Sequence, residues 1–197
     1  MGVNGVGVTG TVGIFGGAFD PPHNGHVALA REAIDHFALS RLLVCVVADP
    51  DHKTVETQPQ VRLTLAELAF AALDEAEVSL DLFGRTVDSL EALDLADPVF
   101  LIGADELAAF PTWTRPDRVL ELARVGAATR PGTDVHALEG LVAALSQPER
   151  IELFPIRPLT VSSSRVRERV ARGLPIDDLV PASVAAEIER LGLYRTT

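Results

Sequence analysis

The strongest constraint on the fold is an alternation of short apolar runs with longer helix-like segments along the chain. Runs such as Leu42 to Val47 and Val99 to Ile102 contain only apolar residues, which is typical of strands covered on both faces. Strands that alternate with helices are joined by right-handed crossovers and build a parallel sheet. The sequence therefore predicts an α/β fold with a doubly wound, mainly parallel sheet and a small helical part at its C-terminal end.

The individual elements are predicted from the spacing of apolar residues. Strands are expected at Thr11 to Phe15, Leu42 to Val47, Val78 to Leu82, Val99 to Ile102, Val125 to Thr129 and Ile151 to Phe154. Helices are expected at Gly25 to Leu39, Val61 to Leu73, Thr86 to Leu93, Pro116 to Leu122, Val135 to Leu145, Ser164 to Arg172 and Ala182 to Leu191. No long Ser/Gly linker divides the chain, so we expect residues 1–197 to form a single domain, with residues 1–10 as a flexible leader.

Composition limits the class of function. The net charge is −11, whereas a protein that binds a long nucleic acid usually offers a basic face, so we expect no nucleic acid polymer as a partner. No apolar stretch approaches the roughly 20 residues of a membrane helix, and the single cysteine excludes an internal disulfide. These features predict a soluble cytoplasmic protein without a membrane partner. One local basic cluster fits a small anionic ligand or a solvated helix face equally well: Arg157, Arg165, Arg167, Arg169 and Arg172.

The segment Gly16 to His26, with the sequence GGAFDPPHNGH, lies where the first predicted strand ends and the first predicted helix begins. Glycines there let the backbone approach a phosphate closely, and the start of the helix offers N–H donors. His23 and His26 are three residues apart, so their imidazoles can share one face and donate to a phosphoryl group that gains negative charge. The segment predicts a phosphate site. The alternative is that the histidines only end a helix and the prolines stiffen a loop.

A second candidate segment is Val161 to Arg167, with the sequence VSSSRVR. Hydroxyl side chains before an apolar-periodic run are a signal for the start of a helix. A cap needs one serine, so the others are available for phosphate oxygens, and Arg167 adds positive charge from the first turn. The alternative is a purely structural cap with solvated arginines.

Together these segments resemble the nucleotidyltransferase superfamily with the H-x-G-H signature, and within it the bacterial nicotinate mononucleotide adenylyltransferases. The similarity runs from about Thr11 to Tyr194. Further segments that match the family's motifs are Asp51 to Lys53, Arg62, Thr86 to Leu90, Gly103 to Asp105, Phe110 with Trp113, Arg130 to Gly132, Leu179 to Pro181 and Gly192 to Tyr194.

The resemblance implies an enzyme with a Rossmann-like fold that transfers AMP from ATP to nicotinate mononucleotide. The products would be nicotinate adenine dinucleotide and pyrophosphate, in the biosynthesis of NAD. Catalytic roles are implied for His23, His26 and Arg167. ATP would be held by Gly16, Gly17, Ala18, Phe19, Lys53, Gly103, Asp105, Ser162, Ser163 and Arg167, and the acceptor by Thr86, Trp113 and Arg130. Mg²⁺ would be carried mainly by the ATP phosphates, with no metal ligand from the protein.

Three departures from the family's pattern bear on the acceptor. Ala18 stands where threonine is usual, Asp51 replaces a proline, and Gly84 with Arg85 replaces Ser-Tyr. The last pair lies near the acceptor's ring, where Arg85 would favour a carboxylate-bearing ring. Nicotinamide mononucleotide and phosphopantetheine therefore stay open as alternative acceptors, although phosphopantetheine enzymes usually carry threonine where His23 stands. A non-catalytic nucleotide-binding module is the other alternative, and a homo-oligomer is left open.

Overall fold

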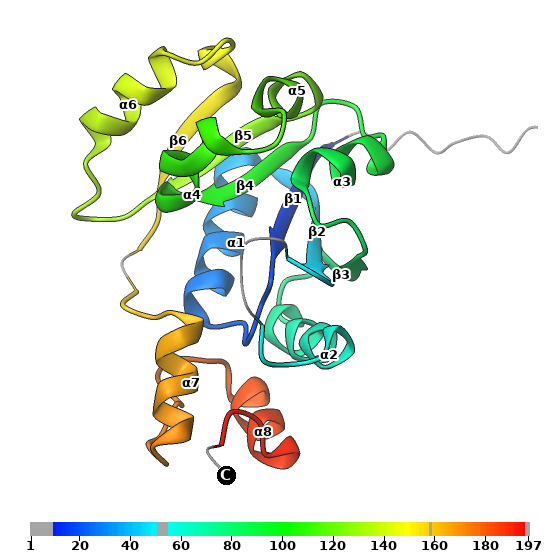
Figure 1. Ribbon diagram of the computed structural model, residues 1–197, viewed down its shortest axis with the longest axis vertical. Coiled ribbons are helices and arrows are strands. Elements are labelled where there is room, and N and C mark those ends of the chain that lie inside the picture. Colours follow the sequence, from blue (N-terminus) through cyan, green and yellow to red (C-terminus); the bar gives the residue numbers. More distant parts are fainter. Residues whose placement is uncertain (1–9, 51–54, 158, 196–197) are drawn as a thin grey trace, which may run out of the picture.

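A parallel sheet of six strands forms the centre of the protein, in the order β3-β2-β1-β4-β5-β6 (Figure 1). This computed structural model describes residues 10–50, 55–157 and 159–195. The strands are β1 (Thr11–Gly17), β2 (Leu39–Val47), β3 (Ala76–Asp81), β4 (Val99–Gly103), β5 (Arg124–Thr129) and β6 (Ile151–Pro155). Each pairing between them is parallel, so the predicted doubly wound α/β fold is confirmed.

Helices cover both faces of this sheet. One face packs against α1 (Asn24–Phe37) and α2 (Pro59–Phe70). The other packs against α3 (Thr86–Leu93), α4 (Ala104–Ala109), α5 (Pro116–Leu122) and α6 (Val135–Ala143). Figure 1 shows α7 (Ser163–Ala171) and α8 (Ala182–Leu191) beyond one end of the strands, with α8 next to α2. This pair is the small helical part that the sequence predicts at the C-terminal end.

Two hydrophobic cores follow from the alternation of side chains along each strand. Ile14 belongs to one core and Phe15 to the other, and Phe100 and Leu101 are divided in the same way. Successive residues of a strand point to opposite faces, so an unbroken apolar run supplies both cores at once. Burying one such large side chain contributes about 1.5–3 kcal/mol. The apolar runs therefore stabilise the fold on both faces of the sheet.

Element boundaries differ from the prediction where local signals are weak. Helix α2 begins at Pro59, two residues before the expected start, because proline lacks an N–H that the first turn would leave unpaired anyway. Helix α4 was not predicted. It has six residues, and its N-cap Gly103 makes no side-chain bond. Six residues make fewer than two helical turns, which is too short for a periodic pattern of apolar residues to indicate a helix.

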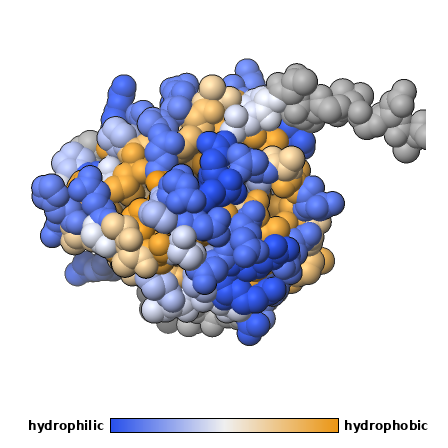
Figure 2. Space-filling model, turned by 90° about the horizontal axis from the view of Figure 1, so that it is seen from above, coloured by the Kyte–Doolittle hydropathy of each residue, from blue (hydrophilic) through white to orange (hydrophobic). Residues whose placement is uncertain are grey.

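The surface at the end of the molecule opposite α7 and α8 is mainly hydrophilic, with smaller apolar areas between the polar residues (Figure 2). At the surface, Arg115, the N-cap of α5, forms ion pairs with Asp88 and Glu91 of α3. Exposed pairs of this kind add little to stability, so the two cores hold the fold together. No helix within the described segments is both long and apolar enough to cross a bilayer.

Candidate active site

A pocket of about 980 Å³ opens where β1 and β4 lie side by side at the centre of the sheet. The chain leaves these two strands toward opposite faces, and ligands of doubly wound folds bind at the carboxyl ends of the strands at this point. The walls come from the ends of β1 and β4 and from the starts of α1, α3, α4 and α7. The volume is close to the upper limit of the usual range of about 300–1,000 Å³ for ligand pockets, which suits two substrates bound together.

Every predicted site residue that the structure describes lines this pocket. They are Gly16, Gly17, Ala18, Phe19, His23, His26, Thr86, Gly103, Asp105, Trp113, Arg130, Ser162, Ser163 and Arg167. Lys53 lies outside the described residues. Folding thus brings the two candidate phosphate segments, which are well over 100 residues apart in the sequence, into one cavity.

The two histidines begin α1 and face each other. His23 is the N-cap, and its Nδ1 accepts from the backbone N–H of His26 at 3.3 Å. His26 Nδ1 in turn accepts from the backbone N–H of His23 at 3.1 Å. The rings stack with their centroids 3.6 Å apart and their planes 16° from parallel. The histidines therefore do cap the end of a helix, here the N-terminal end of α1, as the structural alternative holds, and they line the pocket as well.

The capping bonds indicate which tautomer each imidazole adopts when it is neutral. A nitrogen that accepts a hydrogen bond carries no proton, so in the neutral ring the proton lies on Nε2. His23 is 8% exposed, and burial lowers its pKa to about 4. At neutral pH this residue is an uncharged N–H donor.

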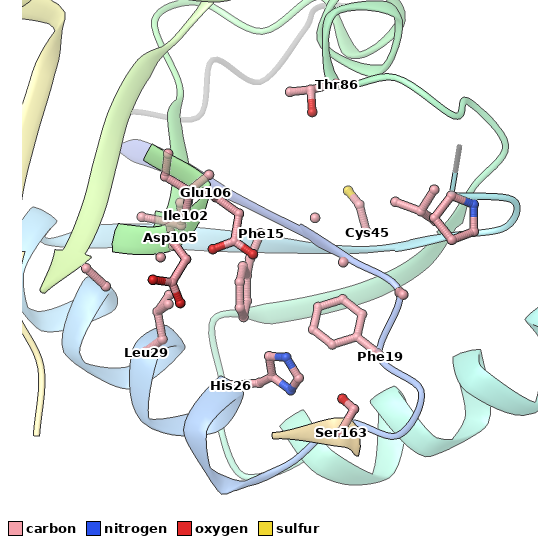
Figure 3. A pocket seen from close by; sticks show the side chains of 18 of the residues that line it. Phe15, Phe19, His26, Leu29, Cys45, Thr86, Ile102, Asp105, Glu106 and Ser163 are labelled. Carbon is pink, nitrogen blue, oxygen red and sulfur yellow. The ribbon is translucent and has the colours of Figure 1, made fainter. Parts of the chain in front are cut away.

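Phe19 forms the floor beside the histidines. Its ring meets that of His26 edge-on at a centroid distance of 5.0 Å, and Figure 3 shows the two side chains next to each other. A Cβ at Gly17 would come within 3.0 Å of the Phe19 ring, so any other residue there would require the ring to shift. Phe19 itself has φ 49°, a left-handed conformation that is unusual for a residue other than glycine.

The serine segment closes the same side of the pocket. Ser162 caps α7 by accepting from the backbone N–H of Arg165 at 3.2 Å. The Ser163 hydroxyl, labelled in Figure 3, donates to the carbonyl oxygen of Pro21 at 2.8 Å. The expectation of a spare hydroxyl is therefore modified at Ser163, because that group already has a protein partner. The backbone N–H groups at the start of α7 are better suited to a phosphate.

The predicted basic cluster is divided by the structure. Arg157 and Arg167 line the pocket, as the small-ligand interpretation requires, and each also pairs with a carboxylate, Arg157 with Glu32 and Arg167 with Glu56 at 2.8 Å. Arg165 donates to the Thr160 carbonyl, while Arg169 and Arg172 pair with acidic side chains and do not line the pocket, as on a solvated helix face. Each interpretation therefore holds for part of the cluster.

The wall across from the histidines is acidic and aromatic. Figure 3 shows the carboxylates of Asp105 and Glu106 extending from α4 toward the cavity. Arg130 approaches Asp105 with 3.5 Å between Nη2 and Oδ2. Trp113 packs against Phe110 with ring centroids 5.2 Å apart. The sequence does not indicate Glu106 as a site residue. Because it does not predict α4, it gives no sign that this side chain faces the pocket.

Arg62 is a structural residue that sequence reasoning named only as part of a motif. It is 0% exposed, and its guanidinium donates to the carbonyl oxygens of Ala18 at 2.6 Å and of Val47 at 2.8 Å. Further bonds reach the carbonyls of Ala48 and Thr57. Arg62 thereby ties the loop after β1 to the end of β2. No local pattern signals this role, because the four acceptors are backbone groups that only the fold brings together.

Comparisons with known proteins agree with this geometry. Residues 14–169 match the model of a family described as cytidylyltransferase-like. A probable nicotinate-nucleotide adenylyltransferase of Thermomicrobium roseum is 37% identical over 196 residues, which cover 94% of this chain and 92% of that protein. One of the same name from Roseiflexus sp. is 38% identical and covers 93% of this chain and 98% of that protein.

A solved structure shows the same fold. Plasmodium falciparum nicotinic acid mononucleotide adenylyltransferase complexed with NaAD superposes with a TM-score of 0.76 at 16% identity. The superposition covers 94% of this chain and 97% of that one.

Proposed function

Because the chain belongs to the cytidylyltransferase-like family, and its curated relatives are named nicotinate-nucleotide adenylyltransferases, we propose that it adenylates nicotinate mononucleotide. ATP would supply AMP, and the products would be nicotinate adenine dinucleotide and pyrophosphate. The observation that carries this proposal is the stacked pair of imidazoles at the switch point, each with its proton on Nε2. Two stacked imidazole donors beside a helix start suit a phosphoryl group that gains charge.

The reaction needs no nucleophile from the protein. An oxygen of the acceptor's 5′-phosphate attacks the α-phosphorus of ATP, a new P–O bond forms, and the bond to the bridging oxygen of pyrophosphate breaks with its electron pair. A phosphate monoester is largely ionised near neutral pH, so no strong base is required. His23 and His26 would donate to the phosphate oxygens, and Arg167 would neutralise charge. Catalysis then follows from alignment and charge stabilisation.

Mg²⁺ fits this site as a companion of ATP. Among the described residues no group of three or more His, Cys, Asp or Glu side chains is placed to hold a metal ion. Mg²⁺ commonly binds through substrate phosphates and water rather than a protein cage. Bound there, the ion would offset phosphate charge, while the histidines and Arg167 hold the ATP in place.

The acceptor would lie between α3 and the aromatic wall. Thr86 begins α3, and Trp113 lines the pocket from the segment after α4. The N-cap of α3 is Arg85, which also lines the pocket and brings positive charge to this end. That arrangement favours a ring with a carboxylate, such as nicotinate, over the neutral amide of nicotinamide.

The test is a coupled assay of pyrophosphate release and dinucleotide formation with ATP, Mg²⁺ and nicotinate mononucleotide. We expect His26→Ala to lower kcat by roughly 10²-fold or more, as when one transition-state donor is removed. His136→Ala is the matched control, because its side chain is 99% exposed. Near-normal turnover in the His26 variant would contradict the assignment. A wild-type protein that binds ATP but releases no pyrophosphate on addition of acceptor would instead be a nucleotide-binding module.

A further inference from the structure

Asp20 is a buried carboxylate between Phe19 and the first histidine, and it is 3% exposed. Its Oδ2 accepts from the backbone N–H of Glu56 at 2.6 Å. Its Oδ1 accepts from the hydroxyl of Tyr194 at 2.7 Å and from that of Thr57. A buried carboxylate is stable only with such donors, so these partners determine where it sits.

The Tyr194 hydroxyl that donates to Asp20 is held in place by its surroundings. Its half-buried ring packs against the hydrophobic core that includes residues of α1 and α2, and its hydroxyl lies 3.4 Å from the Thr57 hydroxyl. Burial is the main cause that raises the pKa of Tyr194, so the hydroxyl keeps its proton and remains a donor. A link of fixed length thus joins the segment after α8 to Asp20.

The loop between β1 and α1, residues 18–23, is called the histidine loop below, and it needs such a link because part of it is strained. Phe19, one residue before Asp20, is left-handed, a conformation that persists only where the surroundings hold it. The Asp20 carbonyl is also bound, by Nη1 of Arg167 at 2.7 Å. Asp20 is therefore the point where the histidine loop meets α7, the loop before α2 and the segment after α8.

We propose that Tyr194 is a positioning residue for the histidine loop, acting through Asp20 to set the angle at which His23 and His26 face the phosphates. This role rests on the proposed adenylyl transfer. Tyr194 is not among the described residues that line the pocket, so its effect passes through Asp20. Small displacements of catalytic groups lower rate strongly, whereas binding contacts elsewhere in the pocket stay in place.

The first experiment replaces only the hydroxyl, with Tyr194→Phe. We expect kcat to fall by about 10-fold, with both KM values changed less than about threefold, and Tm lowered by less than about 5 °C. Ser183→Ala is the matched control, because it removes a hydroxyl that α8 uses to bind the Leu68 carbonyl, away from the histidine loop. That control should keep wild-type kcat.

Amide hydrogen exchange gives a readout that does not depend on turnover. The N–H of Glu56 donates to Asp20, and the N–H of His26 donates to His23. In Tyr194→Phe we expect these two N–H groups to exchange faster, while exchange in β4 stays unchanged. A general loss of stability would speed exchange in β4 as well. If the wild type forms no dinucleotide, the proposed function fails, but this local exchange pattern still decides whether Tyr194 holds the loop.

A mutant cycle tests the route through Asp20. If Tyr194 acts through that side chain, Asp20→Ala combined with Tyr194→Phe should lose no more kcat than Asp20→Ala alone, because alanine has no acceptor for the hydroxyl. Multiplicative losses in the cycle would overturn the proposal, and so would wild-type kcat and wild-type exchange at Glu56 and His26 in Tyr194→Phe. Should Asp20→Ala fail to fold, the kcat and the exchange pattern of the single Tyr194 variant still decide whether the proposal holds.

Discussion

The two nitrogens of each site imidazole have different tasks. Nδ1 of His23 and of His26 holds the first turn of α1, while Nε2 carries the proton. Protonation of His23 would remove its acceptor and break the cap. The proposed catalysis and the start of α1 would therefore both depend on an uncharged His23.

This coupling predicts a specific dependence of stability on pH. The pKa of His23 is lowered from 6.5 to about 4 in the folded protein, so the unfolded chain takes up the proton first as the pH falls. His23 makes its full contribution to the free energy of unfolding above pH 6.5. That contribution, roughly 3 kcal/mol, is lost as the pH falls toward 4.

Urea unfolding of wild type and His23→Asn between pH 7 and pH 4 measures this effect. Asparagine can also cap a helix but does not titrate, so the variant should lack this part of the pH dependence. His136→Asn, at an exposed position, should follow the wild type. Equal pH slopes for wild type and His23→Asn would contradict the prediction.

Arg85 is predicted to select the acceptor. We expect Arg85→Ala to lower kcat/KM for nicotinate mononucleotide by about 10-fold, the usual effect of losing one bond to a charged group. The value for nicotinamide mononucleotide should stay nearly constant, because its amide offers no full charge to the guanidinium. Steady-state kinetics with both acceptors tests this. Parallel losses for the two would show that Arg85 does not read the carboxylate.

At the scale of elements, α1 and α7 both begin at the pocket with a side-chain cap. His23 caps one and Ser162 the other. We expect Ser162→Ala to lower the free energy of unfolding by about 1 kcal/mol, because an N–H of the first turn loses its acceptor. Denaturant titration beside Ser164→Ala, which leaves the cap in place, measures the difference. Indistinguishable losses would argue against Ser162 as the cap.

The sequence predicts elements best where apolar runs are long. The cores of all six strands were located, and α8 has the predicted limits, Ala182–Leu191. Strand β2 begins three residues early at Leu39, because pairing with β1 extends it past the apolar run through polar Ser40 and Arg41. Tertiary pairing of this kind has no local signal.

Contacts between site residues are likewise predictable only where the residues are close in the sequence. His23 and His26 are close in sequence, so spacing alone indicated a shared face. Asp20 and Tyr194 are 174 residues apart and meet only in the folded chain. Motif similarity could name them, but only the structure shows that one donates to the other.

At the scale of the whole molecule, stability is concentrated in buried groups that join distant segments. We expect Arg62→Met to lower the free energy of unfolding by at least about 3 kcal/mol, because four carbonyl oxygens lose their buried donor. Arg41→Met is the control. Its ion pair with Glu77 lies at the surface, and its loss should change stability little. Thermal or urea unfolding measures the stability of both variants. Similar losses of unfolding free energy in the two would refute the view that stability is concentrated in such buried groups.

The sheet has a narrow seam between its halves, where β1 pairs with β4 at Gly13 with Val99 and at Ile14 with Phe100. His26 follows the strand on one side of this seam, and Asp105 follows the strand on the other. A dinucleotide that touches both side chains bridges the halves, so its affinity adds to the cohesion of the protein. The proposed product, with its new diphosphate (P–O–P) bond, would therefore hold the two halves of the sheet together until it leaves the pocket.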